Sequence, residues 1–116
     1  MTELATRRQG VTVAAKLFRG LADPTRLAIL LALLDEELRV VDLVERVGGS
    51  QSNVSGHLAC LKDCGLVTDR PLGRASLYRL GSATVRDLLR QAEDVLDEAG
   101  HAVELCPRYD DEPAPG

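Results

Sequence analysis

The sequence predicts a mainly α-helical fold with a small β-hairpin, arranged as a winged helix-turn-helix. The first observation is a short helical segment, residues 40–47, followed by Gly48-Gly49 and a second helical segment that begins at Ser50. Two helices joined by a tight glycine turn are typical of the helix-turn-helix. The second is a pair of short β-type runs around residues 71–74, which indicates a hairpin, or wing. The third is a composition with only 3% aromatic residues, because an aliphatic core suits packed helices.

The first half of the chain predicts two helices before the helix-turn-helix. A first amphipathic helix is expected from about Val11 to Leu21. Asp23 is a good N-cap for the next helix, and Pro24 at the first helical position loses no hydrogen bond that the helix needs. This second helix, about Thr25 to Leu34, is apolar nearly all round, so we expect it to be the central buried element.

The segment from Ser50 to Val67 predicts the second helix of the helix-turn-helix. Its apolar residues recur at i, i+4 and i+7 and define one core face: Val54, Leu58 and Leu61. After Gly65, two strands are expected at 66–70 and 76–80. Ser82 then caps a long amphipathic helix that Gly100 ends. We therefore expect a flexible N-terminus at 1–10, one domain at 11–100 and a tail at 101–116.

Charge and cysteine content limit the classes of function. The net charge of −4 divides unevenly, because residues 1–81 carry 11 Lys and Arg against 9 Asp and Glu, whereas residues 82–116 carry 3 against 9. The acidity therefore lies away from the helix-turn-helix and does not exclude DNA. No apolar run is long enough for a membrane span or a signal peptide, so we expect a cytoplasmic protein with no membrane partner. In that compartment three cysteines favour free thiols, a metal site or a redox switch over disulfides.

The polar residues of the second helix predict a DNA-reading surface. Short hydrogen-bonding side chains lie at its N-terminal end, which helix-turn-helix proteins place in the major groove. Arg74 at the tip of the wing fits a phosphate or minor-groove contact. Arg70 and Arg79 fit DNA contact and ordinary surface charge equally well. Lys62 is expected to be solvated. The candidate DNA-binding residues are Ser50, Gln51, Ser52, Asn53, Ser55, His57 and Arg74.

The same helix carries Cys60 and Cys64 at spacing i, i+4, so both thiols project from one side. On a helical wheel they lie on a flank about 100° from the core face, given 3.6 residues per turn. This position points away from simple burial in the core. No phosphate-binding glycine loop and no plausible nucleophile–base pair is present, so we do not expect an enzyme.

These residues resemble the ArsR/SmtB family of winged-helix repressors. The resemblance spans about residues 11–100 and rests on three segments: Leu21-Ala22-Asp23-Pro24-Thr25-Arg26, Ser52-Asn53-Val54-Ser55-Gly56-His57-Leu58 and Gly65-Leu66-Val67. It implies a dimeric fold in which the first and last helices form the interface. It also implies binding of double-stranded operator DNA and release on binding an inducer, often a toxic metal ion.

Family metal sites differ in position, and two of them look absent here. One uses two cysteines before the turn, where this chain has Arg39 and Val41. Another uses an Asp-x-His and a later His-x-x-Glu, and only the later half is matched: His101 and Glu104 are present, but Leu88 and Arg90 replace the first half.

The remaining match is to CmtR-type cadmium and lead sensors, with the word HLxCLxxCGL at residues 57–66 and a tail cysteine at Cys106. The resemblance thus implies Cys60, Cys64 and Cys106 as ligands of Cd(II) or Pb(II), which act as inducer, with no organic cofactor. His57, one turn before Cys60, is a weaker candidate ligand. Two alternatives for the thiols stay open: As(III) or Hg(II) as the ion, and sensing of oxidants or electrophiles. A helical dimerisation module that binds a protein partner is the alternative to DNA binding.

Overall fold

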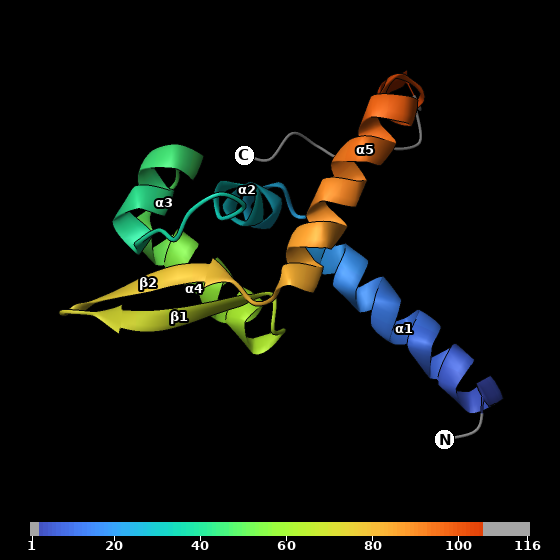
Figure 1. Cartoon of the computed structure of the whole chain (residues 1–116), viewed down its shortest axis with the longest axis horizontal. Coiled ribbons are helices and arrows are strands. Elements are labelled where there is room, and N and C mark those ends of the chain that lie inside the picture. Colours follow the sequence, from blue (N-terminus) through green and yellow to red (C-terminus); the bar gives the residue numbers. More distant parts are fainter. Residues whose placement is uncertain (1–2, 106–116) are drawn as a thin grey trace. The chain divides into compact units, whose positions relative to one another are not determined.

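The computed structural model describes the backbone of residues 3–105 and the side chains of residues 10–103 (Figure 1). Five helices and two antiparallel strands follow one another in these residues, which confirms the predicted fold class. The elements are α1 (Glu3–Ala22), α2 (Pro24–Ala32), α3 (Val40–Val47), α4 (Gln51–Asp63), β1 (Val67–Leu72), β2 (Ala75–Leu80) and α5 (Ala83–Leu105). The chain up to Ser82 forms one compact unit and the remainder forms a second. None of the helices in residues 3–105 is long and apolar enough to cross a membrane.

The two terminal helices are longer than the apolar periodicity indicates. Helix α1 begins at Glu3 instead of near Val11, so helix reaches into the segment expected to be flexible. Helix α5 continues past Gly100 to Leu105. In both cases the added residues are mostly good helix formers, and a glycine inside a helix costs only about 1 kcal/mol. Amphipathic periodicity detects the part of a helix that packs, and at α1 it misses a largely polar extension; at α5 the helix passes through the glycine that is predicted to end it.

The caps and the turn of the helix-turn-helix form as predicted. One carboxylate oxygen of Asp23 accepts hydrogen bonds from the backbone N–H groups of Thr25 and Arg26, at 2.9 and 3.1 Å. The Ser50 hydroxyl accepts from the backbone N–H of Asn53 at 3.0 Å and starts α4. Between α3 and α4 the backbone has positive φ at both glycines, 89° and 86°, a conformation that residues with a Cβ rarely adopt. These local interactions place α4 at a defined angle to α3.

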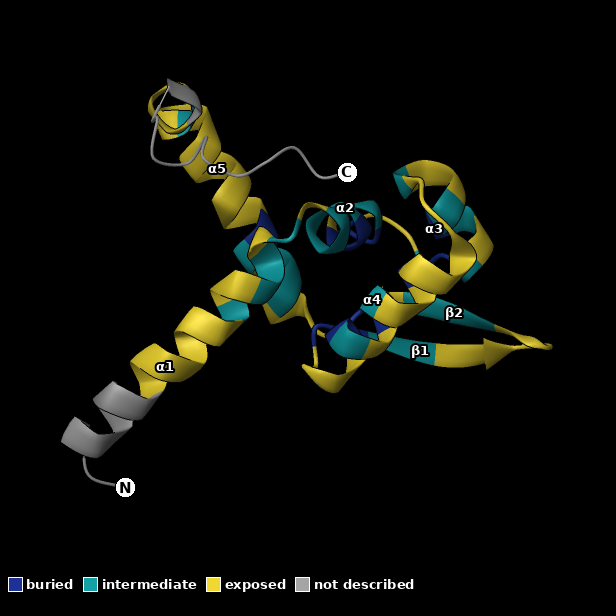
Figure 2. Cartoon of the chain, turned by 180° about the vertical axis from the view of Figure 1, so that it is seen from behind, coloured by how far each residue is buried: buried dark blue, intermediate teal, exposed yellow. Residues whose placement is uncertain are grey.

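The core of the first unit lies between α2, α3 and α4, and Figure 2 shows the buried residues gathered there. Helix α2 packs against α1, α3 and α4, which confirms its predicted central position. The side chains with at most 1% exposure are Ile29, Leu30, Leu33, Leu43, Val54, Leu58 and Leu61. Three of these come from α4 and are the residues predicted from its sequence. The core therefore fixes which face of α4 is turned to solvent.

The wing is a two-stranded hairpin with a tighter turn than expected. Pro71 pairs with Ser76 within the sheet, so only Gly73 and Arg74 form the loop. Gly73 has a φ of 62°, and a positive φ at the first loop residue is what a type II′ turn requires. At the base of the wing, an ideal Cβ at Gly81 would lie 2.2 Å from the carbonyl oxygen of Gly65. Only glycine permits this close approach, which brings the end of β2 beside the end of α4.

Removing the buried side chain of Leu58 should destabilise the first unit. Leu58→Ala leaves a cavity at a site with 0% exposure, so we expect the free energy of unfolding to fall by about 2–5 kcal/mol. Urea unfolding followed by circular dichroism, at one fixed protein concentration, measures this change. Leu31→Ala is the matched control, because Leu31 is 40% exposed and the same substitution there should cost clearly less. Equal losses in the two variants would contradict the assigned core.

Candidate DNA-binding face and thiol pocket

The N-terminal half of α4 presents a polar surface opposite its buried face. The predicted reading residues with exposed side chains are Gln51, Ser52, Asn53 and Ser55. Their exposure follows from the core, because Val54 and Leu58 are fully buried and the helix period turns the intervening positions outward. Ser50 is also exposed, but its hydroxyl already caps the helix. Contact of these residues with DNA stays a prediction.

His57 has a partner inside the chain that the sequence analysis did not foresee. Its ring Nδ1 accepts a hydrogen bond from the Arg26 Nε at 3.1 Å, and both side chains are half-buried. The bond joins α2 to the middle of α4. Arg26 lies in the first of the three family segments, but nothing in the sequence pairs it with a residue 31 positions later.

A single carboxylate holds two arginines of the wing. Glu37, in the segment before α3, lies 3.0 Å from Arg70 and 3.8 Å from Arg79. The two arginines share one face of the hairpin, because Thr68 pairs with Arg79 and Arg70 lies two residues further along β1. Arg74 is exposed in the turn. The wing thus carries three cations, two of which are partly neutralised by Glu37.

The C-terminal end of α4 is tied to the wing by Lys62. Its Nζ lies 3.0 Å from a carboxylate oxygen of Asp69 on β1. The hydrogen bond to Asp69, and then the charge of Asp69, raise the pKa of Lys62, so the amine stays protonated wherever the pair forms. Lys62 was expected to be solvated; it is 53% exposed but ion-paired. Contacts thus restrain α4 at its middle and at its end.

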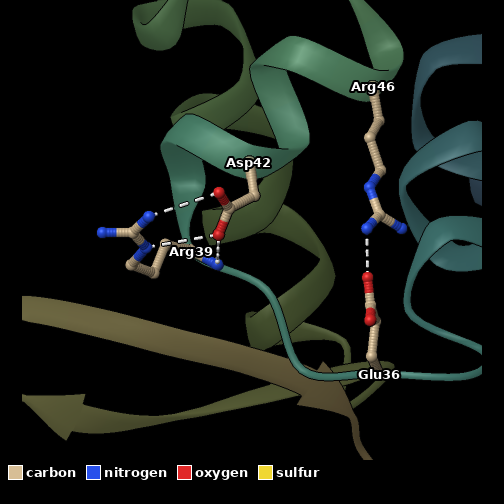
Figure 3. A network of polar contacts seen from close by, with 4 residues as sticks. All are labelled: Glu36, Arg39, Asp42 and Arg46. Atoms are coloured by element: carbon tan, nitrogen blue, oxygen red, sulfur yellow. Dashed lines mark hydrogen bonds and ion pairs between the residues drawn. The ribbon is translucent and has the colours of Figure 1, made fainter.

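Helix α3 has polar contacts at its start and near its end (Figure 3). The Arg39 backbone N–H and guanidinium both donate to Asp42, at 3.1 and 3.2 Å. These hydrogen bonds lower the pKa of Asp42. Arg46 of the same helix pairs with Glu36. Arg39, one of the two residues that replace the thiols of the site implied by the resemblance, is thus engaged in an ion pair.

Cys60 and Cys64 lie together in one cavity of the first unit. Both are free thiols; Cys60 is half-buried and Cys64, which caps the end of α4, is exposed. The cavity has a volume of about 260 Å³. Its lining comes from α1, α2, α4 and two residues of the segment that follows α4, and consists of Val13, Lys16, Leu17, Gly20, Arg26, Cys60, Leu61, Cys64 and Leu66. The predicted flank of α4 therefore faces a recess between helices.

The third predicted ligand, Cys106, lies outside the described residues. In the part of the chain that the structure describes, no group of three or more His, Cys, Asp or Glu side chains could hold a metal ion. Two thiols of the predicted set line the same cavity, and His57, one turn before Cys60, is engaged by Arg26.

Neutralising Glu37 should strengthen electrostatic binding of DNA. Glu37→Gln removes the counter-charge of Arg70 and Arg79, and an exposed pair is worth about 0.2–1 kcal/mol. We expect the affinity for a duplex of arbitrary sequence to rise roughly twofold to fivefold, since such binding depends on phosphate contacts. Fluorescence anisotropy at several salt concentrations measures it.

Glu36→Gln is the control for this measurement. It makes the same change of charge in the same segment, but its partner is Arg46 on α3. An equal gain in both variants would mean that net charge alone matters and that Glu37 has no special effect on the wing.

Comparisons with known proteins place this architecture in a family. The family model described as "Bacterial regulatory protein, arsR family" matches residues 23–69. A probable mercury resistance operon repressor of Streptomyces lividans is 42% identical over 94 residues, covering 81% of this chain and 75% of that protein. The HTH-type transcriptional regulator CmtR of Mycobacterium tuberculosis is 43% identical over 82 residues, covering 71% of this chain and 70% of that protein.

Solved structures agree with this result. The crystal structure of Mycobacterium tuberculosis Rv0081 matches with a TM-score of 0.75 and 31% identity, over 79% of this chain and 93% of that one. The homodimeric winged helix-turn-helix DNA-binding domain of Mb0332 from Mycobacterium bovis matches with a TM-score of 0.74 and 28% identity. The match covers 84% of this chain and 89% of that one. The relatives are transcriptional regulators and not enzymes. With the helix-turn-helix, the wing and these similarities in hand, we conclude that the chain belongs to the ArsR/SmtB family of transcriptional repressors.

Proposed function

We propose that this repressor binds operator DNA as a homodimer and releases it when a soft heavy-metal ion binds Cys60, Cys64 and Cys106. Cd(II) or Pb(II) is the proposed inducer, and Hg(II) is the alternative that the similarity to a mercury resistance repressor supports. One observation carries the proposal: two free thiols, one helical turn apart, line a single cavity on the helix that bears the DNA-reading residues.

The donor set of the cavity fits a thiophilic ion. Its lining contains two sulfur atoms and no carboxylate or imidazole, which suits soft ions and disfavours hard ones. Lys16 and Arg26 in the same lining supply positive charge near the anionic thiolates that a metal requires. A bound ion would supply a cross-link between α4 and the tail that carries Cys106. The two described thiols leave room in the coordination shell for this third ligand.

The DNA-binding step uses the two surfaces already described. The exposed residues at the start of α4 enter the major groove, and Arg74 contacts phosphates beside it. Large apolar side chains are exposed on α1 and on α5, which supports a role for each helix in a dimer interface: Val11, Val13 and Phe18, and Val95, Leu96 and Val103. Two copies would place two α4 helices on successive half-sites.

Release requires only that ligand binding disfavour the DNA-bound orientation of α4. Arg26 lines the thiol cavity and also holds His57 of α4, so a change at the cavity acts on a contact of the reading helix. Lys62, two residues from each thiol, restrains the C-terminal end of α4 through Asp69. A coupling free energy of about 1–3 kcal/mol is enough for a useful change in operator affinity.

A redox or electrophile sensor is the second candidate function. The specific observation in its favour is the exposure of Cys64 together with the free state of both thiols. In that case the thiols act without a metal, and peroxide or an alkylating agent releases the DNA.

Replacing any of the three cysteines should separate DNA binding from induction. We expect Cys60→Ser, Cys64→Ser and Cys106→Ser to bind operator with an affinity within about twofold of the wild type, since serine is nearly isosteric and none of the three lies at the N-terminal end of α4. Each should lose most of the release by Cd(II) or Pb(II). The measurement is anaerobic anisotropy on a duplex selected by the protein from a random pool, alongside thiolate-to-metal charge-transfer absorbance.

The control is Ser52→Ala, which should bind metal normally and bind the duplex more weakly. Normal induction of any of the three serine variants would remove that cysteine from the site. Release by peroxide without charge-transfer absorbance would instead establish the redox sensor.

A further inference from the structure

We propose that the cavity beside Cys60 and Cys64 binds an arylmercury cation, a soft metal that carries one aromatic ring, with the ring inside the cavity and the metal on a thiol. The proposal rests on the proposed function in one respect, because it takes these cysteines as the inducer site. It adds the class of inducer: an organic derivative of the metal in addition to the bare ion.

The size and lining of the cavity fit an aromatic ring. An enclosed apolar cavity of about 150 Å³ holds benzene; this recess, which is partly open to solvent, measures about 260 Å³. Its lining includes four aliphatic side chains, of which Leu61 and Leu66 are buried and Val13 is largely exposed at the rim: Val13, Leu17, Leu61 and Leu66. At Gly20 the wall recedes further, because an added Cβ would meet only the end of the Arg26 side chain, at 3.8 Å. A bare metal ion uses none of this apolar volume.

The thiols and the polar part of the lining set the chemistry. An arylmercury cation already has one mercury–carbon bond, so one thiolate completes its preferred linear coordination. The thiol gives up a proton, a sulfur–mercury bond forms, and the anion that accompanied the cation leaves; nothing is oxidised or reduced. The step therefore needs Cys60 or Cys64 and does not need Cys106. The flexible stem of Lys16 can cover the ring while its amine stays in water.

The cavity predicts a preference for phenylmercury over methylmercury, which an exposed thiol alone does not have. Phenylmercury and methylmercury form the same sulfur–mercury bond, but only the phenyl group is large enough to gain from the aliphatic walls. The Cys106→Ser protein keeps both cavity thiols. We therefore expect that removing phenylmercury from it takes at least tenfold more glutathione than removing methylmercury. Native mass spectrometry of the full chain at increasing glutathione measures the retained adduct directly.

Filling the recess tests whether the cavity causes this preference. Gly20→Leu places a side chain in the recess. In this variant we expect the glutathione concentrations that remove phenylmercury and methylmercury to differ by no more than about twofold. Gly10→Leu is the matched control on the same helix: an added Cβ there meets nothing within 4 Å, and the residue does not line the cavity. Both changes favour the helix, so neither should unfold the protein; a thiol titration and circular dichroism check this.

The outcomes separate this inference from the proposed function. No preference for phenylmercury in Cys106→Ser, or an unchanged preference in Gly20→Leu, would overturn the inference even if the wild type binds Cd(II) through three thiols. A preference that Gly20→Leu removes would support it even if Cd(II) and Pb(II) fail to bind, a result that would contradict only the proposed inducer.

Discussion

The burial of one face of α4 is the constraint on which the rest of the structure depends. Val54, Leu58 and Leu61 are at most 1% exposed and pack in the core with α2 and α3. A helix cannot turn one face inward without fixing its other faces. The same three residues therefore direct Ser52 and Ser55 to solvent and turn Cys60 and Cys64 toward the cavity. The proposed DNA-reading residues and the proposed ligand-binding thiols are therefore positioned by the same hydrophobic seam, the buried face of α4.

Weaker polar contacts adjust α4 on this seam. The Arg26–His57 hydrogen bond is half-buried, and the Lys62–Asp69 ion pair is partly exposed. Exposed pairs contribute about 1 kcal/mol or less, which is similar to the coupling that a switch requires. The core holds the helix in place, while contacts of this strength can be exchanged when a ligand binds. Strong tethers at these positions would make the helix unresponsive.

Local interactions were predictable from the sequence, whereas contacts between distant residues were not. The Asp23 and Ser50 caps, the glycine turn and the core face of α4 each depend on residues that follow one another at intervals of at most four positions. Glu37 and Arg70 are 33 positions apart, and their ion pair follows from the fold. The same holds for the cavity, because α1 supplies part of its wall. Spacing predicted two thiols on one flank but not the apolar space beside them.

The residues proposed to read DNA and the thiols proposed to bind a ligand are well separated along α4, which is how one helix could carry both. Ser52 and Cys60 are separated by about 12 Å along the axis, at 1.5 Å per residue. A ligand on the thiols therefore has no need to touch DNA or to compete with it directly. Because the helix is rigid, a small rotation about the seam at its C-terminal end also moves its N-terminal end, where DNA contacts demand a defined geometry. In the proposed mechanism, a ligand that fills the cavity and one that cross-links the thiols would both act on this C-terminal end, so we expect the cavity walls and the sulfur atoms to select the inducer together.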